Sequence, residues 1–234
     1  MKRIITLILW LIAIFSTCPT QAVARNYDLL ACKKIMAQNP PKITVQYTFN
    51  KLQYDFSLSE KQLEAIFHEV NPNQPMLGKI LGMNRLIPEY TITTSTSPHV
   101  LGSDNICHIP SEIIIKISYN KPTIYVANSL PKDSCRFKVT LRHEQAHADV
   151  GYSAMMLLIR SLRNQMPKIV EEQGPRVSSI ENIGNVARSM SEDYVNRTKY
   201  IFQIFQDTLI EQQSRYDSEE NYLDESQLCR KGLL

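Results

Sequence analysis

Residues 141 to 149 constrain this chain most, because they read Leu-Arg-His-Glu-Gln-Ala-His-Ala-Asp and contain the pattern His-Glu-x-x-His. On a helix, two histidines four residues apart lie on one face, so both imidazoles can reach one ion. Zn²⁺ accepts such nitrogen ligands and keeps a position open to water when the site is catalytic. Glu144 directly follows the first histidine, where it can act as a general base. The motif therefore predicts a helix that carries a zinc site made by His143 and His147; the alternative is an accidental match in an ordinary helix.

A catalytic zinc site needs a third protein ligand besides the two histidines. The metzincin pattern would place a glycine and a third histidine shortly after His147, but Val150 and Ser153 occupy those positions. The third ligand is then expected from a downstream segment, as in gluzincins. The candidates among the downstream carboxylates are Glu171, Glu172, Glu181, Glu192, Asp217 and Glu220. Each of them can equally be a solvated surface charge.

The first residues have the features of an export signal. Lys2 and Arg3 precede an apolar run from Ile4 to Phe15, and Ala22-Val23-Ala24 supplies the small residues that signal peptidase requires. The apolar run is short for a membrane span, which needs about 20 residues. We therefore expect residues 1–24 to be a signal peptide, and the mature protein to be periplasmic or secreted.

The charge balance does not favour an electrostatic partner. The formal net charge is +3, and Lys2 and Arg3 contribute two of those positive charges. The remainder is close to neutral, so neither a nucleic acid nor an anionic membrane surface is expected as a partner. No segment after the export signal is apolar and long enough to span a membrane. Residues 25–234 are expected to form one zincin-like domain.

Four cysteines follow the export signal: Cys32, Cys107, Cys135 and Cys229. An even number in an exported chain predicts two disulfides, which three pairings can satisfy. Cys107 and Cys135 flank one strand-rich segment, and Cys32 and Cys229 lie near the two ends, so these are the expected pairs. A cysteine zinc site is the alternative, although the chain contains no Cys-x-x-Cys spacing.

Alternating apolar residues predict strands in the first half of the chain. The expected strands cover Ile43–Thr48, the region of Tyr54 and Phe56, Tyr90–Ser95, Glu112–Tyr119 and Thr123–Ala127. The last two are expected to form a hairpin around Asn120-Lys121-Pro122, because so few residues separate them.

Helical patterns dominate the second half. Two shorter helices are expected earlier in the chain, over Asn26–Gln38 and over Glu60–Val70, the latter capped by Ser57 or Ser59. The motif helix should start at Asp133 or Ser134 and end at Pro167, followed by a loop over Ile169–Pro175. A long amphipathic helix follows from Val186. This order predicts an α+β fold with an antiparallel or mixed sheet, then the motif helix and a long C-terminal helix.

Taken together, these features resemble the exported bacterial zincin-like proteins that are regarded as predicted Zn-dependent proteases, a family of largely unknown function. The likeness covers roughly Ile43 to Tyr222. It rests on the Thr-rich strand, a Cys before the paired strands, a second Cys ahead of the Leu-x-His-Glu-x-x-His helix, and the closing Tyr216-Asp217. Members of the family carry a Thr at the position of Glu220 and His-Gly where this chain has Tyr222-Leu223.

The resemblance implies a zincin-like fold and a zinc-dependent peptidase with Glu144 as general base. Because the family's closing His is absent, Glu220 is expected to be the third zinc ligand, with Asp217 in reserve and Glu192 as the main alternative. A peptide or protein substrate is expected to lie along the Thr123–Ala127 strand, with Tyr222 available to stabilise the oxyanion. The alternative is a non-catalytic exported protein that binds a metal or a partner through the same fold.

Overall fold

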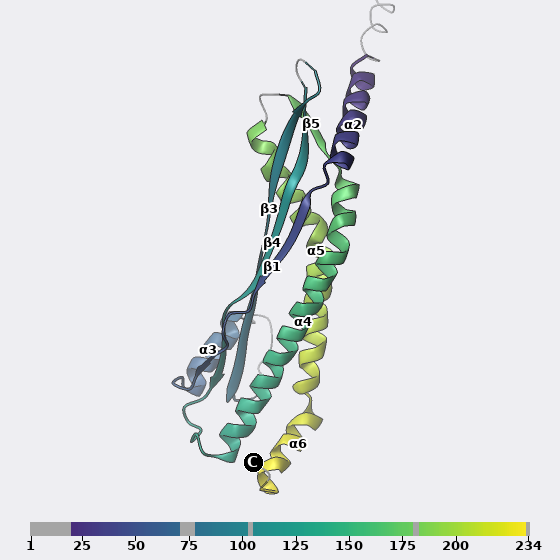
Figure 1. Ribbon diagram of the computed structural model, residues 1–234. Coiled ribbons are helices and arrows are strands. Elements are labelled where there is room, and N and C mark those ends of the chain that lie inside the picture. Colours follow the sequence, from purple (N-terminus) through teal and green to yellow (C-terminus); the bar gives the residue numbers. More distant parts are fainter. Residues whose placement is uncertain (1–19, 71–77, 103–104, 180–182, 233–234) are drawn as a thin grey trace, which may run out of the picture. The chain divides into compact units, whose positions relative to one another are not determined.

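The computed structural model describes residues 20–70, 78–102, 105–179 and 183–232 (Figure 1). Its helices are α2 (Thr20–Gln38), α3 (Glu60–Val70), α4 (Cys135–Gln173), α5 (Ile183–Tyr216) and α6 (Glu219–Arg230). Its strands are β1 (Lys42–Thr48), β2 (Gln53–Asp55), β3 (Gly82–Val100), β4 (Asn105–Val126) and β5 (Arg176–Ser179). Most of the expected signal peptide lies outside the described residues. Among those described, no helix is both long and apolar enough to cross a bilayer.

The sheet is organised around β4. Within the described residues it has five strands; β4 lies between β1 and β2, and β3 and β5 also pair with β4. β2 runs parallel to β4, with Gln53 opposite Thr123, whereas β5 runs antiparallel to it, with Asn105 opposite Ser179. The sheet is therefore mixed, and the expected α+β class is confirmed.

The predicted hairpin at Asn120–Pro122 is wrong, because β4 continues through these residues to Val126. Before the turn-like residues 120–122, the buried positions of β4 are the odd-numbered residues from 113 to 119. After them, the even-numbered Ile124 and Val126 are buried. Lys121 has φ 44°, and Asn120 and Lys121 are both exposed. The polar residues Asn120 and Lys121 therefore mark a shift in the alternation within β4 and not a chain reversal.

The predicted end of the motif helix at Pro167 is also wrong. α4 is 39 residues long and includes Pro167. A proline inside a helix costs about 3 kcal/mol, but Ile169 and Val170 just after it are buried, and each such burial contributes about 1.5–3 kcal/mol. The helix ends before Gly174, which has φ 65° and whose N–H donates to the Val170 carbonyl. A glycine in the left-handed conformation is a common helix terminator.

The chain divides into two compact units, each assembled from separate stretches. The first unit comprises the described residues up to Thr44, with Thr93–Ile113 and Pro167–Tyr194. The second comprises Val45–Ile92, Ile114–Met166 and Val195–Leu234.

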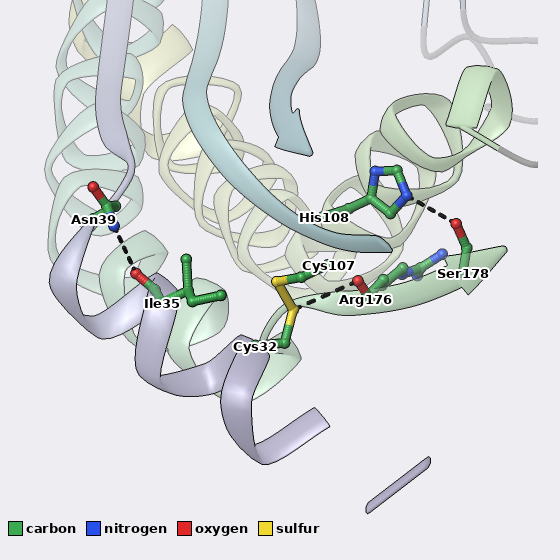
Figure 2. Close-up of a disulfide and its surroundings, with 7 residues drawn as sticks. All are labelled: Cys32, Ile35, Asn39, Cys107, His108, Arg176 and Ser178. Carbon is green, nitrogen blue, oxygen red and sulfur yellow. Dashed lines mark hydrogen bonds between the residues drawn. A yellow bond between two sulfur atoms is a disulfide. The ribbon is translucent and has the colours of Figure 1, made fainter. Parts of the chain in front are cut away.

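The first unit contains α2, β5 and the disulfide between Cys32 and Cys107 (Figure 2). The disulfide is buried with Ile109, and Ile35, Met36, Leu101 and Val177 pack around it. The Cys32 Sγ lies 3.7 Å from the carbonyl oxygen of Arg176. Next to Cys107, the buried His108 places its Nε2 2.8 Å from the Ser178 Oγ on β5.

The expected disulfide pairs Cys107–Cys135 and Cys32–Cys229 are corrected to Cys32–Cys107 and Cys135–Cys229. The expected pairing relied on position in the sequence alone, with Cys107 and Cys135 on either side of a strand-rich segment and Cys32 and Cys229 near the two ends. Because β4 continues as one strand, each further residue leads about 3.3 Å away from Cys107. A disulfide needs Cα atoms about 4.4–6.8 Å apart. Two disulfides fit a protein of an oxidising, exported compartment.

In the second unit, α4 packs on the sheet through an apolar core. Ile124 and Val126 of β4 are buried with Phe137 and Ala148 of α4. The hydroxyl of the fully buried Tyr119 donates to the Gly151 carbonyl at 2.7 Å, which joins β4 to α4 again. These contacts fix the rotation of α4 and direct its other faces away from the sheet.

The helices α4 and α5 of the second unit run antiparallel. The Tyr200 hydroxyl of α5 donates to Gln165 of α4. Further along α5, the Tyr216 ring lies 5.8 Å from the ring of His147, which is earlier on α4. The end of α5 is thereby brought back to the His-Glu-x-x-His segment.

Candidate metal centre

The helix that carries the motif begins with a side-chain cap. The Phe137 N–H donates to the Ser134 Oγ at 3.1 Å, which satisfies one of the backbone donors that every helix start leaves free. The Phe137 ring then packs edge-on against Phe56 at 5.1 Å. The start of α4 is therefore anchored one to two turns before the first histidine.

Asp217 meets the two histidines of the motif. Its Oδ1 lies 3.0 Å from Nε2 of His147 and 3.2 Å from Nε2 of His143, and the two histidine nitrogens are 3.0 Å apart. Both histidines are buried, whereas the Asp217 side chain is half exposed. Asp217 lies between the end of α5 at Tyr216 and the capping residue of α6, Ser218. The site is thus buried on the α4 side and open on the Asp217 side.

The spacing of these three atoms fits a small tetrahedral cation. Two ligands bound to Zn²⁺ at 2.0–2.1 Å and at the tetrahedral angle lie about 3.3 Å from each other. The three separations in this cluster are 3.0 to 3.2 Å, and the group can hold a metal ion. Two imidazole nitrogens and one carboxylate oxygen form a typical zinc donor set with one position left open.

The structure places the three expected third ligands differently. Asp217, the reserve, joins the histidines. Glu220 is exposed on α6, and the group that can hold a metal ion does not include it. Glu192 is exposed on the part of α5 that belongs to the first unit, whereas the histidines belong to the second.

The helix α6 brings the expected Tyr222 to the site and adds Glu225, which the sequence analysis did not include. Glu225 places both carboxylate oxygens 3.2 Å from Nδ1 of His143. The Tyr222 ring stacks on the ring of His143, with centroids 5.1 Å apart, and its hydroxyl donates to Asp217 Oδ1 at 3.0 Å. Tyr222 and Glu225 are three residues apart and so share a helix face. Its three-residue spacing from Tyr222 is the one feature of the sequence that could have connected Glu225 with the site.

Several carboxylates give the site a negative potential. Burial lowers the pKa of His143, but the hydrogen bond to Asp217 and the charges of Glu144 and Glu225 outweigh it and raise the pKa to about 9. Burial acts to raise the pKa of Asp217, but hydrogen bonds with His143 and His147 outweigh it and hold that pKa well below its usual range. This environment favours a positive charge between the histidines, which either a proton or a metal ion can supply.

Glu144 is a residue of α4 whose side chain lies against Gly82 at the start of β3. Its side chain is buried, and burial raises its pKa to about 7, although the charges of His147 and His143 act in the opposite direction. A Cβ atom built on Gly82 would lie 2.7 Å from Glu144 Oε1 and 2.6 Å from Thr140 Cγ2. Only a residue without a side chain allows Glu144 its present position, so Gly82 belongs to the site although no sequence motif marks it.

A cavity of about 400 Å³ opens beside the centre. Its lining residues are Val150, Gln212, Arg215, Tyr216 and Asn221. Val150 follows His147 on α4 at a distance of one helical turn, and the Tyr216 ring lies against His147. The lining combines apolar, amide and cationic groups, and its volume is sufficient for a substrate side chain.

No family model, no curated protein and no solved structure matches this chain. The chemistry of the site itself therefore has to indicate the function. That chemistry comprises three side chains that can hold a cation, a buried carboxyl group with a pKa near neutrality, and an adjoining cavity.

Proposed function

We propose that this protein is an exported zinc-dependent peptidase of the zincin-like type, in which His143, His147 and Asp217 hold the ion and Glu144 is the general base. The observation that carries this proposal is the third carboxylate, which lies within 3.2 Å of both histidine nitrogens. A zinc ion bound there would polarise a carbonyl group and lower the pKa of a bound water to about 7.

Glu144 is suited to move the proton. A general base works best when its pKa lies near the operating pH, and burial raises the pKa of Glu144 to about 7. Its place next to His143 in the chain keeps it beside the ligands, while Gly82 leaves room for its side chain. We infer that Glu144 accepts a proton from the attacking water and later passes it to the leaving amine.

Tyr222 is suited to donate a hydrogen bond at the same site. Burial, and then the charge and hydrogen bond of Asp217, raise the pKa of its hydroxyl above the ordinary value of 10, so it is protonated at neutral pH. The hydroxyl donates to Asp217 and so helps to fix that carboxylate. A neutral donor next to the ligands can also stabilise negative charge that develops on a substrate oxygen.

The substrate edge proposed from the sequence needs correction. Thr123–Ala127 is not a free edge, because Thr123 to Tyr125 pair with β2 and the Ala127 N–H donates to the Leu81 carbonyl. Within the described residues β2 pairs with β4 alone. The hydroxyl of the exposed Tyr54 on β2 accepts a hydrogen bond from Gln145, next to the general base. We infer that an extended peptide binds along β2, as peptides do when they add to a sheet edge.

Removal of the base tests this function. Glu144→Gln keeps the shape of the side chain but cannot accept the proton, so peptide hydrolysis should fall by more than about 10²-fold. Zinc content, measured by atomic emission, should stay at the wild-type level. Glu220→Gln, which makes the same chemical change at an exposed position, is the matched control and should keep wild-type hydrolysis. A Glu144→Gln protein as active as the wild type would show that Glu144 is not the general base, and a zinc-loaded wild type that hydrolyses no peptide would leave only the non-catalytic, metal-binding alternative.

A further inference from the structure

We propose that Glu225 is a positioning residue for His143, and that the Cys135–Cys229 disulfide holds Glu225 in place. This inference rests on the metal centre of the proposed function. It assigns a role to α6, which the motif alone does not involve.

Glu225 determines which nitrogen of His143 is free. Its two oxygens lie 3.2 Å from Nδ1, and Nε2 of the same ring faces Asp217 and His147. A carboxylate beside Nδ1 accepts the proton of that nitrogen, which leaves the Nε2 lone pair for a cation. Carboxylates that orient a metal-binding histidine in this way also raise its basicity.

Glu225 is more than a solvated surface charge that happens to lie nearby. Its side chain is only 20% exposed. Asn221, one turn earlier on α6, donates its Nδ2 to Glu225 Oε1 at 3.3 Å. The carboxylate is therefore held from two sides, by the amide of its own helix and by the imidazole of α4.

Three contacts of α6 with α4 lie on one face of α6. Tyr222 stacks on His143, Glu225 hydrogen-bonds to His143, and Cys229 is bonded to Cys135, the first residue of α4. These three residues of α6 are spaced by three and four positions, so they follow one side of the helix. The disulfide lies one turn beyond Glu225 on that same side.

Apolar packing does little to hold α6. Among its described side chains none is buried, and Tyr222 and Leu223 are at least half exposed. A helix of 12 residues is marginal in water without packing. The covalent bond at Cys229 is thus the main restraint on α6, and breaking it should let Glu225 leave His143.

Zinc affinity, measured by competition with a chromophoric chelator, tests the role of Glu225. Glu225→Leu removes the acceptor and should weaken zinc binding by about 10–100-fold. Glu225→Gln keeps an acceptor without the charge and should give a smaller loss. Glu220→Leu, on the same helix but exposed, should bind zinc like the wild type.

A second readout separates positioning from a structural role. In the zinc-loaded wild type, NMR should show a slowly exchanging Nδ1 proton on His143, and this signal should shift or disappear in Glu225→Leu. If Glu225→Leu binds zinc as tightly as the wild type and keeps that signal, the role of Glu225 is overturned while the metal centre stands. If the wild type itself binds no zinc, the metal centre and the proposed function are overturned together.

The two disulfides provide a matched pair for the second part of the proposal. Replacing Cys135 and Cys229 by serine should weaken zinc binding about as much as Glu225→Leu does. Replacing Cys32 and Cys107, which lie in the other unit, should leave zinc affinity unchanged. Equal zinc affinity in both double variants would overturn the role of the Cys135–Cys229 bond. Far-UV circular dichroism of each variant shows that it is folded.

Discussion

Asp217 Oδ1 lies 3.0 Å from Nε2 of His147, although 70 residues separate the two in the chain. The antiparallel run of α5 along α4 brings them together, because it returns the end of α5 to the motif. The carboxylate that meets both histidines is therefore the first residue after a long helix and not a residue further into the tail. This geometry explains why Asp217 reaches the histidines and Glu220 does not.

Gly82 should be essential for the position of Glu144 but not for metal binding. In Gly82→Ala, the new Cβ would lie within 3 Å of Glu144 and Thr140, so the carboxylate must move. A displacement of about 1 Å at a catalytic group can cost about 10²-fold in rate. We expect kcat for a peptide to fall by at least about tenfold, with zinc affinity within about twofold of the wild type.

The control for this variant is Gly102→Ala, because a Cβ at Gly102 meets nothing within 4 Å. It should leave kcat unchanged. Full activity in Gly82→Ala would show that Glu144 tolerates displacement, and so that its present position is not required for catalysis.

The stability of the protein should fall in mild acid because of His108. Burial lowers the pKa of His108 below its ordinary value of 6.5. The unfolded state then binds the proton more readily than the folded state, so the stabilisation is present above about pH 6.5 and is lost as pH falls through the lower, folded pKa. The residue opposite His108 on the neighbouring strand β5 is Arg176, and the guanidinium of Arg176 forms an ion pair with Asp193.

Urea denaturation followed by far-UV circular dichroism at pH 7.5 and pH 5 checks this prediction. His108→Gln cannot titrate but keeps a group that can hydrogen-bond to Ser178. The free energy of unfolding should therefore decrease less between the two pH values in the variant than in the wild type. Equal decreases would show that His108 does not contribute to the acid sensitivity.

Peptide mapping under non-reducing conditions should recover the pairs Cys32–Cys107 and Cys135–Cys229. The bridges close long loops, with sequence separations of 75 and 94, and each should stabilise the fold by about 2–4 kcal/mol. Free thiols, or a peptide that joins Cys107 to Cys135, would contradict the structure.

Local signals allowed much of the fold to be predicted. Ser59 caps α3 as expected, with the Gln62 N–H donating to its hydroxyl and its own N–H donating to the Gln62 side chain, and Ser134 caps α4. The His-Glu-x-x-His segment is helical, and a long helix follows Val186. Each of these features depends on residues within one or two turns of one another, which a sequence displays directly.

The features that could not be predicted depend on distant packing. Pro122 and Pro167 are strong local breakers, but β4 and α4 continue through them because the flanking residues are buried. The disulfide pairs join segments 75 and 94 residues apart, and the positions of the cysteines in the sequence do not show which of these segments meet. The choice of Asp217 over Glu220 depends on the residue at which α5 ends, and a difference of one turn decides which carboxylate faces the histidines.

Titration calorimetry of zinc into metal-free protein tests the metal centre most directly, with Asp217→Ala compared against Glu220→Ala. The wild type should bind one ion per chain. Asp217→Ala should lose more than about 100-fold in affinity, because it removes a ligand and not merely a group that orients one. Glu220→Ala should bind like the wild type. If Glu220→Ala loses zinc while Asp217→Ala retains it, or if the wild type binds none, the centre formed by His143, His147 and Asp217 is contradicted.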